Sequence, residues 1–244
     1  MTSPARRNEL AENLAAVRQR ILRACSSVGR DPDEVRLIVV TKHFPASDVL
    51  TLHELGVRDV GENRDQEAAG KVAEVRTTLR DREGGSEAEV LTFHFIGQLQ
   101  SNKTGRVAGY ADVVHSLDRA KVIDGLARGA QAADRDLDVL VQVSLDGDTS
   151  RGGARREQVS ELADRAAAHD RLHLRGVMAV APLGADPEVC FTDLRDVADG
   201  IRARHPDATW VSAGMSADLE PAVAAGATHL RVGTAILGSR PPLL

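Results

Sequence analysis

Aromatic side chains and cysteine are scarce in this 244-residue chain, and each shortage excludes a class of function. Only 2% of the residues are aromatic, so platforms that stack nucleic-acid bases are not expected. Cys25 and Cys190 are far apart and form neither a CxxC pair nor another metal-ligand spacing, which predicts no disulfide framework and no zinc site. This use of cysteine is typical of a reducing cytoplasm.

The charge and the hydropathy of the chain exclude two kinds of partner. The formal net charge is −5, so no overall positive field would attract nucleic-acid phosphates or an anionic membrane surface. No apolar run approaches the roughly 20 residues of a membrane-spanning helix. The N-terminal segment also lacks the apolar stretch of a secretion signal. We therefore expect a cytoplasmic protein with no nucleic-acid partner and no membrane association.

Short β-branched runs alternate with helical patterns along the chain. A helix is predicted at about 8–24, where apolar residues recur at helical spacing and Asn8 can act as the cap. Strands are predicted after it at 35–42, 57–60, 91–97, 111–117, 138–145, 172–180, 209–214 and 229–236. Strict alternation of eight strands with helices favours a single α/β fold, the (β/α)₈ TIM barrel of about 250 residues, over a doubly wound sheet.

The chain shows no internal division. No Pro- or Ser-rich linker interrupts it, so we expect one domain over residues 1–244, with a loop at 81–89 and a C-terminal tail at 239–244. A complete barrel without an obvious apolar stripe on its surface predicts a monomer.

Lys42 ends the first predicted strand, and the functional groups of a barrel gather at the C-terminal ends of its strands. Behind it stands the aliphatic run 37–40, which would bury the stem and leave a desolvated amine able to form a Schiff base with a carbonyl ligand. A lysine that merely leaves the strand for solvent is the alternative. The chain has only three other lysines, Lys71, Lys103 and Lys121, and this scarcity favours the functional interpretation.

Two glycine-containing segments are predicted to hold a phosphate, which barrels commonly bind after strands seven and eight. Residues 212–218 leave a strand through small residues, and Ser216 can cap the next helix, so exposed amides there suit a phosphate dianion. Arg231, Gly233 and Thr234 then offer a cation, close backbone approach and a hydroxyl donor.

The eight histidines form no HExxH or HxH pattern, so no metal site is predicted. His94 and His115 lie in predicted strands, where each has an even chance of pointing inward. We expect a hydrogen-bonded structural role for both, and a place in the pocket lining at most.

Ordered motifs cover nearly the whole chain. They are VVTKHFP (39–45), DVGENRDQE (59–67), FHFIGQLQSNK (93–103), VHSLDR (114–119), VLVQVSLDGDTSRGG (139–153), LRGVMAV (174–180) and VSAGMSADLEPAVAAGATHLRVGTAILG (211–238). In these motifs the chain strongly resembles the YggS/PROSC family, the pyridoxal-phosphate-binding homeostasis proteins related to the barrel domain of alanine racemase. The resemblance implies a barrel like that domain, preceded by the extra N-terminal helix.

The resemblance also implies a cofactor and its ligands. Pyridoxal 5'-phosphate (PLP) would be held as an internal aldimine on Lys42, with Asn63 of the GEN motif lining it. Arg231 would lie beside the ring or the phosphate. The phosphate would be bound by Ser212, Gly214, Ser216, Gly233 and Thr234.

Two departures bear on activity. The family often carries a second lysine two positions after the Schiff-base lysine, where this chain has Phe44. Racemisation needs acid–base groups on both faces of the cofactor, and alanine racemase supplies one as a tyrosine from an additional domain across a dimer. The only tyrosine here, Tyr110, lies just before the fourth predicted strand and away from the expected mouth.

We therefore expect a non-catalytic carrier that holds PLP reversibly and delivers it to PLP-dependent apo-enzymes. One alternative is a small PLP-dependent racemase or lyase of weak activity with Lys42 as its base. Another is a barrel enzyme that acts on a sugar phosphate, for which the phosphate site would remain.

Overall fold

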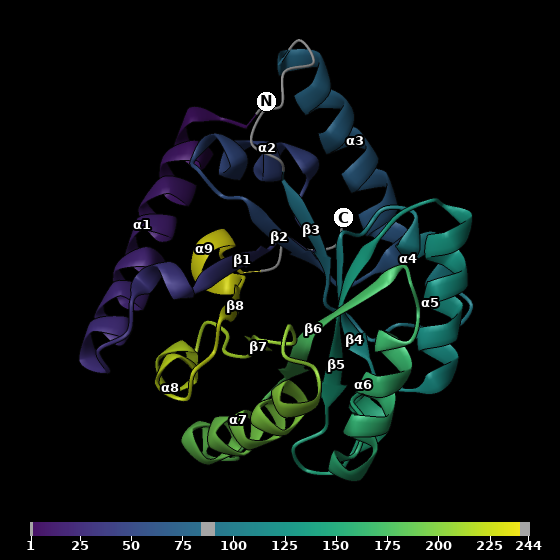
Figure 1. Ribbon diagram of the computed structural model, residues 1–244. Helices are drawn as coiled ribbons and strands as arrows, with labels where there is room; N and C mark the ends of the chain where they lie inside the picture. Colours follow the sequence, from purple (N-terminus) through teal and green to yellow (C-terminus); the bar gives the residue numbers. More distant parts are fainter. Residues whose placement is uncertain (1, 84–90, 240–244) are drawn as a thin grey trace.

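A closed barrel of parallel strands forms the centre of the computed structural model, which describes residues 2–83 and 91–239 (Figure 1). The strands follow one another around the barrel in chain order: β1 (Arg36–Val40), β2 (Asp59–Glu62), β3 (Thr92–Phe95), β4 (Val113–Leu117), β5 (Leu137–Val143), β6 (Leu172–Ala179), β7 (Trp210–Ser212) and β8 (His229–Val232). Parallel pairing of β8 with β1 closes the sheet. The predicted (β/α)₈ barrel is confirmed.

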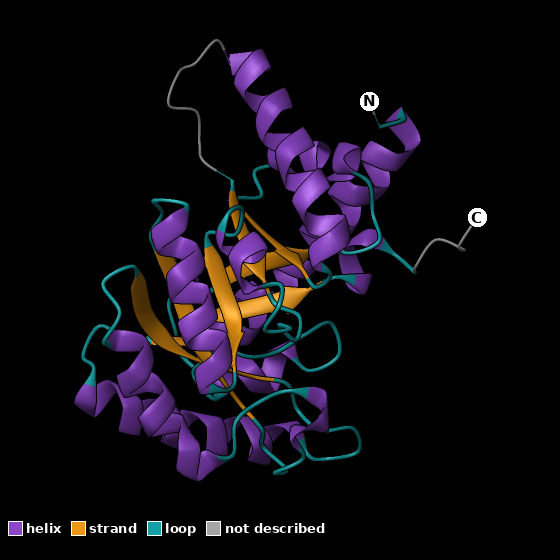
Figure 2. Ribbon diagram, turned by 90° about the vertical axis from the view of Figure 1, so that its right-hand side faces the viewer, coloured by secondary structure: helices purple, strands orange, loops and turns teal. Residues whose placement is uncertain are grey.

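Helices surround the strands on the outside of the barrel (Figure 2). They are α1 (Pro4–Ser27), α2 (Ala46–Glu54), α3 (Asp65–Glu83), α4 (Thr104–Ala108), α5 (Ala120–Ala132), α6 (Val159–Ala167), α7 (Pro187–Arg204), α8 (Leu219–Ala224) and α9 (Thr234–Leu237). Of the loop predicted at 81–89, residues 81–83 belong to α3, and the rest lies outside the described residues. The predicted tail at 239–244 also lies outside them, apart from residue 239.

Helix α1 is the predicted addition to the barrel, but it begins earlier than expected. The Ser3 side chain accepts a hydrogen bond from the amide of Arg6, and Pro4 occupies the first turn, where its missing N–H costs nothing. Asn8 is therefore inside the helix rather than its cap. The apolar face of α1 packs against α8 and α9, and Asn13 Nδ2 donates a hydrogen bond to the carbonyl of Ile236.

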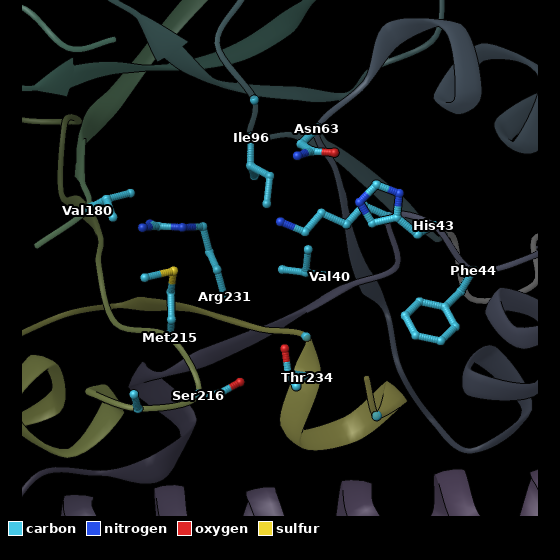
Figure 3. A pocket seen from close by; sticks show the side chains of 15 residues that line it. Val40, His43, Phe44, Asn63, Ile96, Val180, Met215, Ser216, Arg231 and Thr234 are labelled. Carbon is cyan, nitrogen blue, oxygen red and sulfur yellow. The ribbon is translucent and has the colours of Figure 1, made fainter. Parts of the chain in front are cut away.

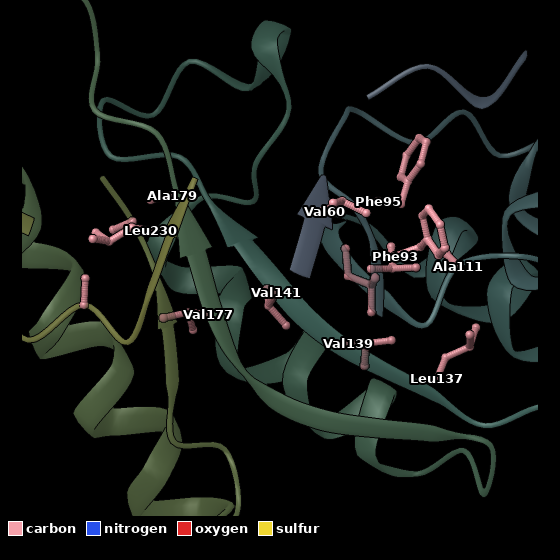
Figure 4. Packing of buried hydrophobic residues seen from close by; sticks show 14 of the residues in the cluster. Val60, Phe93, Phe95, Ala111, Leu137, Val139, Val141, Val177, Ala179 and Leu230 are labelled. Carbon is pink, nitrogen blue, oxygen red and sulfur yellow. The ribbon is translucent and has the colours of Figure 1, made fainter. Parts of the chain in front are cut away.

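The hydrophobic core lies between the outer face of the barrel and the helices. Val60, Phe93, Val139 and Leu230, from four different strands, belong to it and are at most 2% exposed (Figure 4). Burial of such side chains stabilises the fold by about 1.5–3 kcal/mol each. Because strand side chains alternate, the neighbouring positions point into the barrel, where several are polar.

Most of the predicted strand ends differ from those of the structure by one to four residues, and the second and eighth strands show this most clearly. Strand β2 runs from Asp59 to Glu62, two residues later than predicted, so Gly61 and Glu62 belong to the strand instead of following it. Strand β8 ends at Val232, whereas we predicted 229–236, because residues 234–237 form α9 and bury their apolar side chains beneath α1.

Candidate functional site

A pocket of about 390 Å³ opens at the C-terminal ends of the strands (Figure 3). Its volume is within the range of small-molecule binding sites, roughly 300–1,000 Å³. In Figure 3, Asn63 and Ile96 lie on one side, Ser216 and Thr234 lie on the other, and Arg231 lies between. The lining residues are Val40, Lys42, His43, Phe44, Asn63, Ile96, Gly97, Val180, Met215, Ser216, Ala217, Arg231, Gly233, Thr234 and Gly238.

The pocket brings together six of the eight residues that the sequence nominates for the cofactor: Lys42, Asn63, Ser216, Arg231, Gly233 and Thr234. Ser212 and Gly214 are outside its lining. Ser212 is fully buried, and its hydroxyl contacts other side chains. Gly214 has a φ of 88°, and a Cβ there would lie 2.6 Å from the Cβ of Ala222, so only glycine fits this turn.

Lys42 follows the end of β1 by two residues, on a segment held by a buried ion pair. Lys71 Nζ, from α3, donates to Glu62 Oε1 at 2.7 Å and to the carbonyl oxygen of Thr41 at 2.9 Å. Thr41 Oγ1 also donates to Glu62 Oε1, at 2.6 Å. On the other side of Lys42, His43 has a φ of 70°, a left-handed conformation that turns the chain sharply. The backbone around Lys42 is thus fixed from both sides.

Ser216 does not cap a helix, contrary to our prediction. Helix α8 begins at Leu219, after Asp218, whose Oδ1 accepts a hydrogen bond from the amide of Met215 at 2.6 Å. Ser216 Oγ instead accepts from the amide of Ala235 at 3.3 Å, which joins the loop after β7 to α9. The two predicted phosphate segments therefore meet at one wall of the pocket.

Arg231 brings a buried positive charge to the pocket. Its NH1 group donates to Ser212 Oγ at 2.5 Å, and its NH2 group donates to the carbonyl of Ala179 at 2.7 Å. Burial lowers the pKa of the guanidinium to about 10, an effect that the carboxylate of Asp218 opposes, so the group stays charged at neutral pH. Within residues 2–83 and 91–239, no carboxylate forms an ion pair with Arg231.

Sequence reasoning missed the apolar wall of the pocket and the rim at Phe44. Ile96, Val180 and Met215 line the pocket but belong to no chemical motif. Phe44 also lines it, with the guanidinium of Arg6 lying 5.4 Å from the ring centroid. Phe44, which stands where the resemblance implies a second lysine, therefore belongs to the pocket rim.

Three other features concern Tyr110, metal ligands and membrane-spanning helices. Tyr110 is buried and outside the pocket lining, and burial raises the pKa of its hydroxyl. The described residues contain no group of three or more His, Cys, Asp or Glu side chains placed to bind a metal ion. None of the described helices has the length and apolar character needed to cross a membrane.

Comparison with known proteins identifies the family. Residues 9–241 match the model of the alanine racemase N-terminal domain. The chain is 42% identical to the pyridoxal phosphate homeostasis protein of Mycobacterium tuberculosis, covering 97% of this chain and 95% of that protein.

Solved structures agree with this assignment. The crystal structure of an unknown protein from Bifidobacterium adolescentis matches with a TM-score of 0.90 and 32% identity, over 97% of both chains. PipY from Synechococcus elongatus, solved with PLP bound, matches with a TM-score of 0.78 and 32% identity, over 94% of this chain and 100% of that one. The chain therefore belongs to the pyridoxal phosphate homeostasis family, whose fold is that of the alanine racemase N-terminal domain.

Proposed function

We propose that this protein binds PLP reversibly, with the amine of Lys42 as its covalent anchor, and carries the cofactor to PLP-dependent apo-enzymes. The observation that carries the proposal is the pocket, where an amine, an amide, two hydroxyl groups and a buried guanidinium surround one cavity. PipY, which shares the fold at 32% identity, was solved with PLP bound. The proposed carrier is a monomer of one domain over residues 1–244 that acts in the cytoplasm.

Lys42 and Asn63 fit the aldehyde end of PLP. A Schiff base forms when the Lys42 amine adds to the aldehyde carbon and one water leaves, so the bond is reversible by hydrolysis. Asn63 Oδ1 is buried and has no hydrogen-bond partner among the described residues. An unpaired buried polar atom costs about 1–3 kcal/mol, which a polar group of the ligand would recover.

The opposite wall fits the phosphate. We propose that the hydroxyls of Ser216 and Thr234 donate to it, and that Gly233 lets the backbone approach closely. A Cβ at Gly233 would lie 3.2 Å from the Cβ of Val40, so this position is already tight. The charge of Arg231 complements the phosphate dianion.

We propose that Ser212 and Gly214 support the phosphate end of the site without lining the pocket themselves. Gly214 gives the turn its shape, and Ser212 contacts Arg231.

Carrier function explains the site better than catalysis. The Mycobacterium tuberculosis relative is named for homeostasis rather than for a reaction. The single tyrosine of the chain, Tyr110, does not line the pocket, so it cannot supply the proton that a racemase needs on the second face. One observation favours the alternative of a weak racemase or lyase: His43 lines the pocket, and its imidazole is an acid–base group.

Borohydride trapping tests the binding site. Purified protein incubated with PLP should show a visible absorption band that borohydride converts into a pyridoxyl adduct, and peptide mass mapping should place the adduct on Lys42. Lys42→Ala should lose the band. Lys103→Ala is the matched control, because Lys103 lines a neighbouring pocket and should leave the band intact. A wild-type protein without the band, or an adduct on another lysine, would refute the assignment.

Solvent deuterium exchange separates carrier from enzyme. A carrier should incorporate deuterium at the Cα of added amino acids no faster than free PLP does. Exchange well above that rate, lost in His43→Ala, would establish the racemase or lyase instead.

A further inference from the structure

A line of five hydrogen-bonded side chains crosses the inside of the barrel from Arg231 to Asp59. Arg231 NH1 donates to Ser212 Oγ at 2.5 Å, and Ser212 Oγ lies 3.0 Å from His115 Nδ1. His115 Nε2 lies 2.9 Å from His94 Nδ1, and His94 Nε2 lies 2.9 Å from Asp59 Oδ1. The residues come from β8, β7, β4, β3 and β2, and none is more than 8% exposed.

The chemistry of the two end groups, a guanidinium and a carboxylate, fits a single direction along this line. The guanidinium can only donate, so Ser212 Oγ accepts from Arg231, and the single hydroxyl proton of Ser212 is available for His115 Nδ1. Burial and the neighbouring cationic groups hold the pKa of His115 well below its usual range, so its ring is neutral. A neutral His115 that accepts at Nδ1 must carry its proton on Nε2 and donate it to His94.

The same logic continues to the far end of the barrel. His94 accepts at Nδ1, so in its neutral form it donates from Nε2 to the carboxylate of Asp59. Burial raises the pKa of Asp59, but the hydrogen bond from His94 and the charge of Arg36 outweigh it, so the pKa is lowered. Asp59 begins β2, 3.7 Å from the guanidinium of the exposed Arg36. All four bonds therefore point from the pocket toward an anion at the opposite end.

We infer that Ser212, His115, His94 and Asp59 are positioning residues that orient the guanidinium of Arg231 toward the bound PLP. This inference rests on the proposed function. Arg231 has five N–H donors, and only two of the hydrogen bonds described in the protein use them. The remaining donors can serve a ligand in the pocket only while the line holds the guanidinium in place. Ser212 then acts on the ligand through Arg231, because its own proton is committed to His115.

The inference predicts that a residue without contact to the ligand affects ligand affinity. A change at Asp59, at the end of the barrel opposite the pocket, should alter the affinity for PLP. A polar network that only filled the barrel would change stability when cut but would leave the orientation of Arg231, and hence ligand affinity, unchanged.

Substitutions at two buried serines test the line. Ser212→Ala removes the hydroxyl between Arg231 and His115, and loss of a hydrogen bond to a charged group should weaken PLP binding at least about tenfold. Ser116→Ala is the matched control, because Ser116 is also fully buried in the barrel wall but its hydroxyl has no partner among the described residues. It should leave affinity unchanged. PLP titrations followed by absorbance give the dissociation constants.

Rescue and coupling separate positioning from packing. Ser212→Thr keeps the hydroxyl and should restore affinity to within about threefold of the wild type, if one hydrogen bond accounts for the loss. Asp59→Asn should also weaken binding, and the combination with Ser212→Ala should weaken it less than the product of the two effects, because both cut one network.

Nitrogen-15 spectra of the histidine rings test the line in the unloaded protein. At neutral pH, His115 should be neutral with the proton on Nε2, and Ser212→Ala should shift the Nδ1 signal of His115. A proton on Nδ1 of His115, or a charged ring, would overturn the inference.

The two proposals fail in different ways. If the wild type forms no adduct on Lys42, the proposed function is refuted, whereas the ring spectra still decide whether the line exists. If the wild type binds PLP and both Ser212→Ala and Asp59→Asn bind it equally well, the positioning role is refuted and the carrier function stands.

Discussion

The buried ion pair behind Lys42 permits a quantitative test of how the pocket is held. The Lys71 side chain is 9% exposed and that of Glu62 is 2% exposed, with Nζ and Oε1 2.7 Å apart. Glu62 Oε2 is already without a hydrogen-bond partner in the described structure. Lys71→Met keeps most of the apolar stem and removes the charge, so it leaves Glu62 with the hydroxyl of Thr41 alone.

The expected cost follows from burial. Removing one partner of a buried ion pair costs about 3–5 kcal/mol, because the remaining charge is desolvated without compensation. For a chain of this length, each kcal/mol lowers the unfolding midpoint by roughly 2–4 °C, so a fall of more than about 6 °C is expected. The double variant Lys71→Met, Glu62→Gln should recover most of this loss, since the amide can still accept from Thr41 and no charge remains.

Thermal and urea unfolding of the variants measure the effect, with Lys121→Met on the exposed surface of α5 as the control. Lys71 also holds the carbonyl of Thr41, so PLP capture by Lys42 should be slower in Lys71→Met at a temperature where both proteins are folded. Stability of Lys71→Met within about 1 kcal/mol of the wild type would refute the reasoning, since only a solvated pair is worth so little. A double variant less stable than the single one would refute it as well.

Substitutions at Gly214 and His229 give two further predictions. Gly214→Ala should lower the free energy of unfolding by about 1–3 kcal/mol, because the residue has a φ of 88° and its new Cβ would lie 2.6 Å from that of Ala222. Gly70→Ala inside α3 is the control, since its new Cβ meets no atom within 4 Å and should not destabilise the protein; equal urea midpoints for the two variants would contradict the argument. Burial lowers the pKa of His229 from 6.5 to about 3, so between these values the unfolded chain binds a proton that the folded chain refuses, and stability falls as the pH falls. At pH 5 this costs about 2 kcal/mol, so the fall in stability from pH 7 to pH 5, measured by urea unfolding, should be about 2 kcal/mol smaller in His229→Phe than in the wild type. The same fall in both proteins would show that His229 does not contribute to it.

The barrel could be predicted because strand and helix alternation is a local pattern. The ends of the strands could be predicted less well, because they depend on contacts between distant parts of the chain. The predicted eighth strand runs through Ile236, yet Ile236 belongs to α9, which packs against α1 at the beginning of the chain. Asn8 was predicted as the cap, whereas Ser3 caps α1, since apolar spacing alone does not show where the first turn begins.

The pocket lining was largely predictable, because a strand end and a motif place Lys42, Asn63 and Thr234 without any knowledge of side-chain contacts. The hydrogen bonds that hold the pocket residues in place could not be predicted. Lys71 is one of only four lysines, but nothing in the sequence shows that its amine reaches the carbonyl of Thr41, 30 residues away. His94 and His115 are hydrogen-bonded inside the barrel, as we expected, but alternation gave each only an even chance of pointing inward.

The two buried cations near the pocket are compensated differently, and the difference matters for a carrier. The charge of Lys71 is neutralised at 2.7 Å by Glu62, so it fixes the backbone beside Lys42 and contributes little to ligand binding. Among the described residues, Arg231 donates hydrogen bonds only to neutral groups, and the carboxylate of Asp59 lies four hydrogen bonds away along the line. A buried cation without a contacting anion raises the free energy of the unloaded protein, and a dianionic phosphate in the pocket lowers it again. In the proposed carrier, affinity for the phosphate would thus come from Arg231, while the hydrolysable bond at Lys42 would permit release.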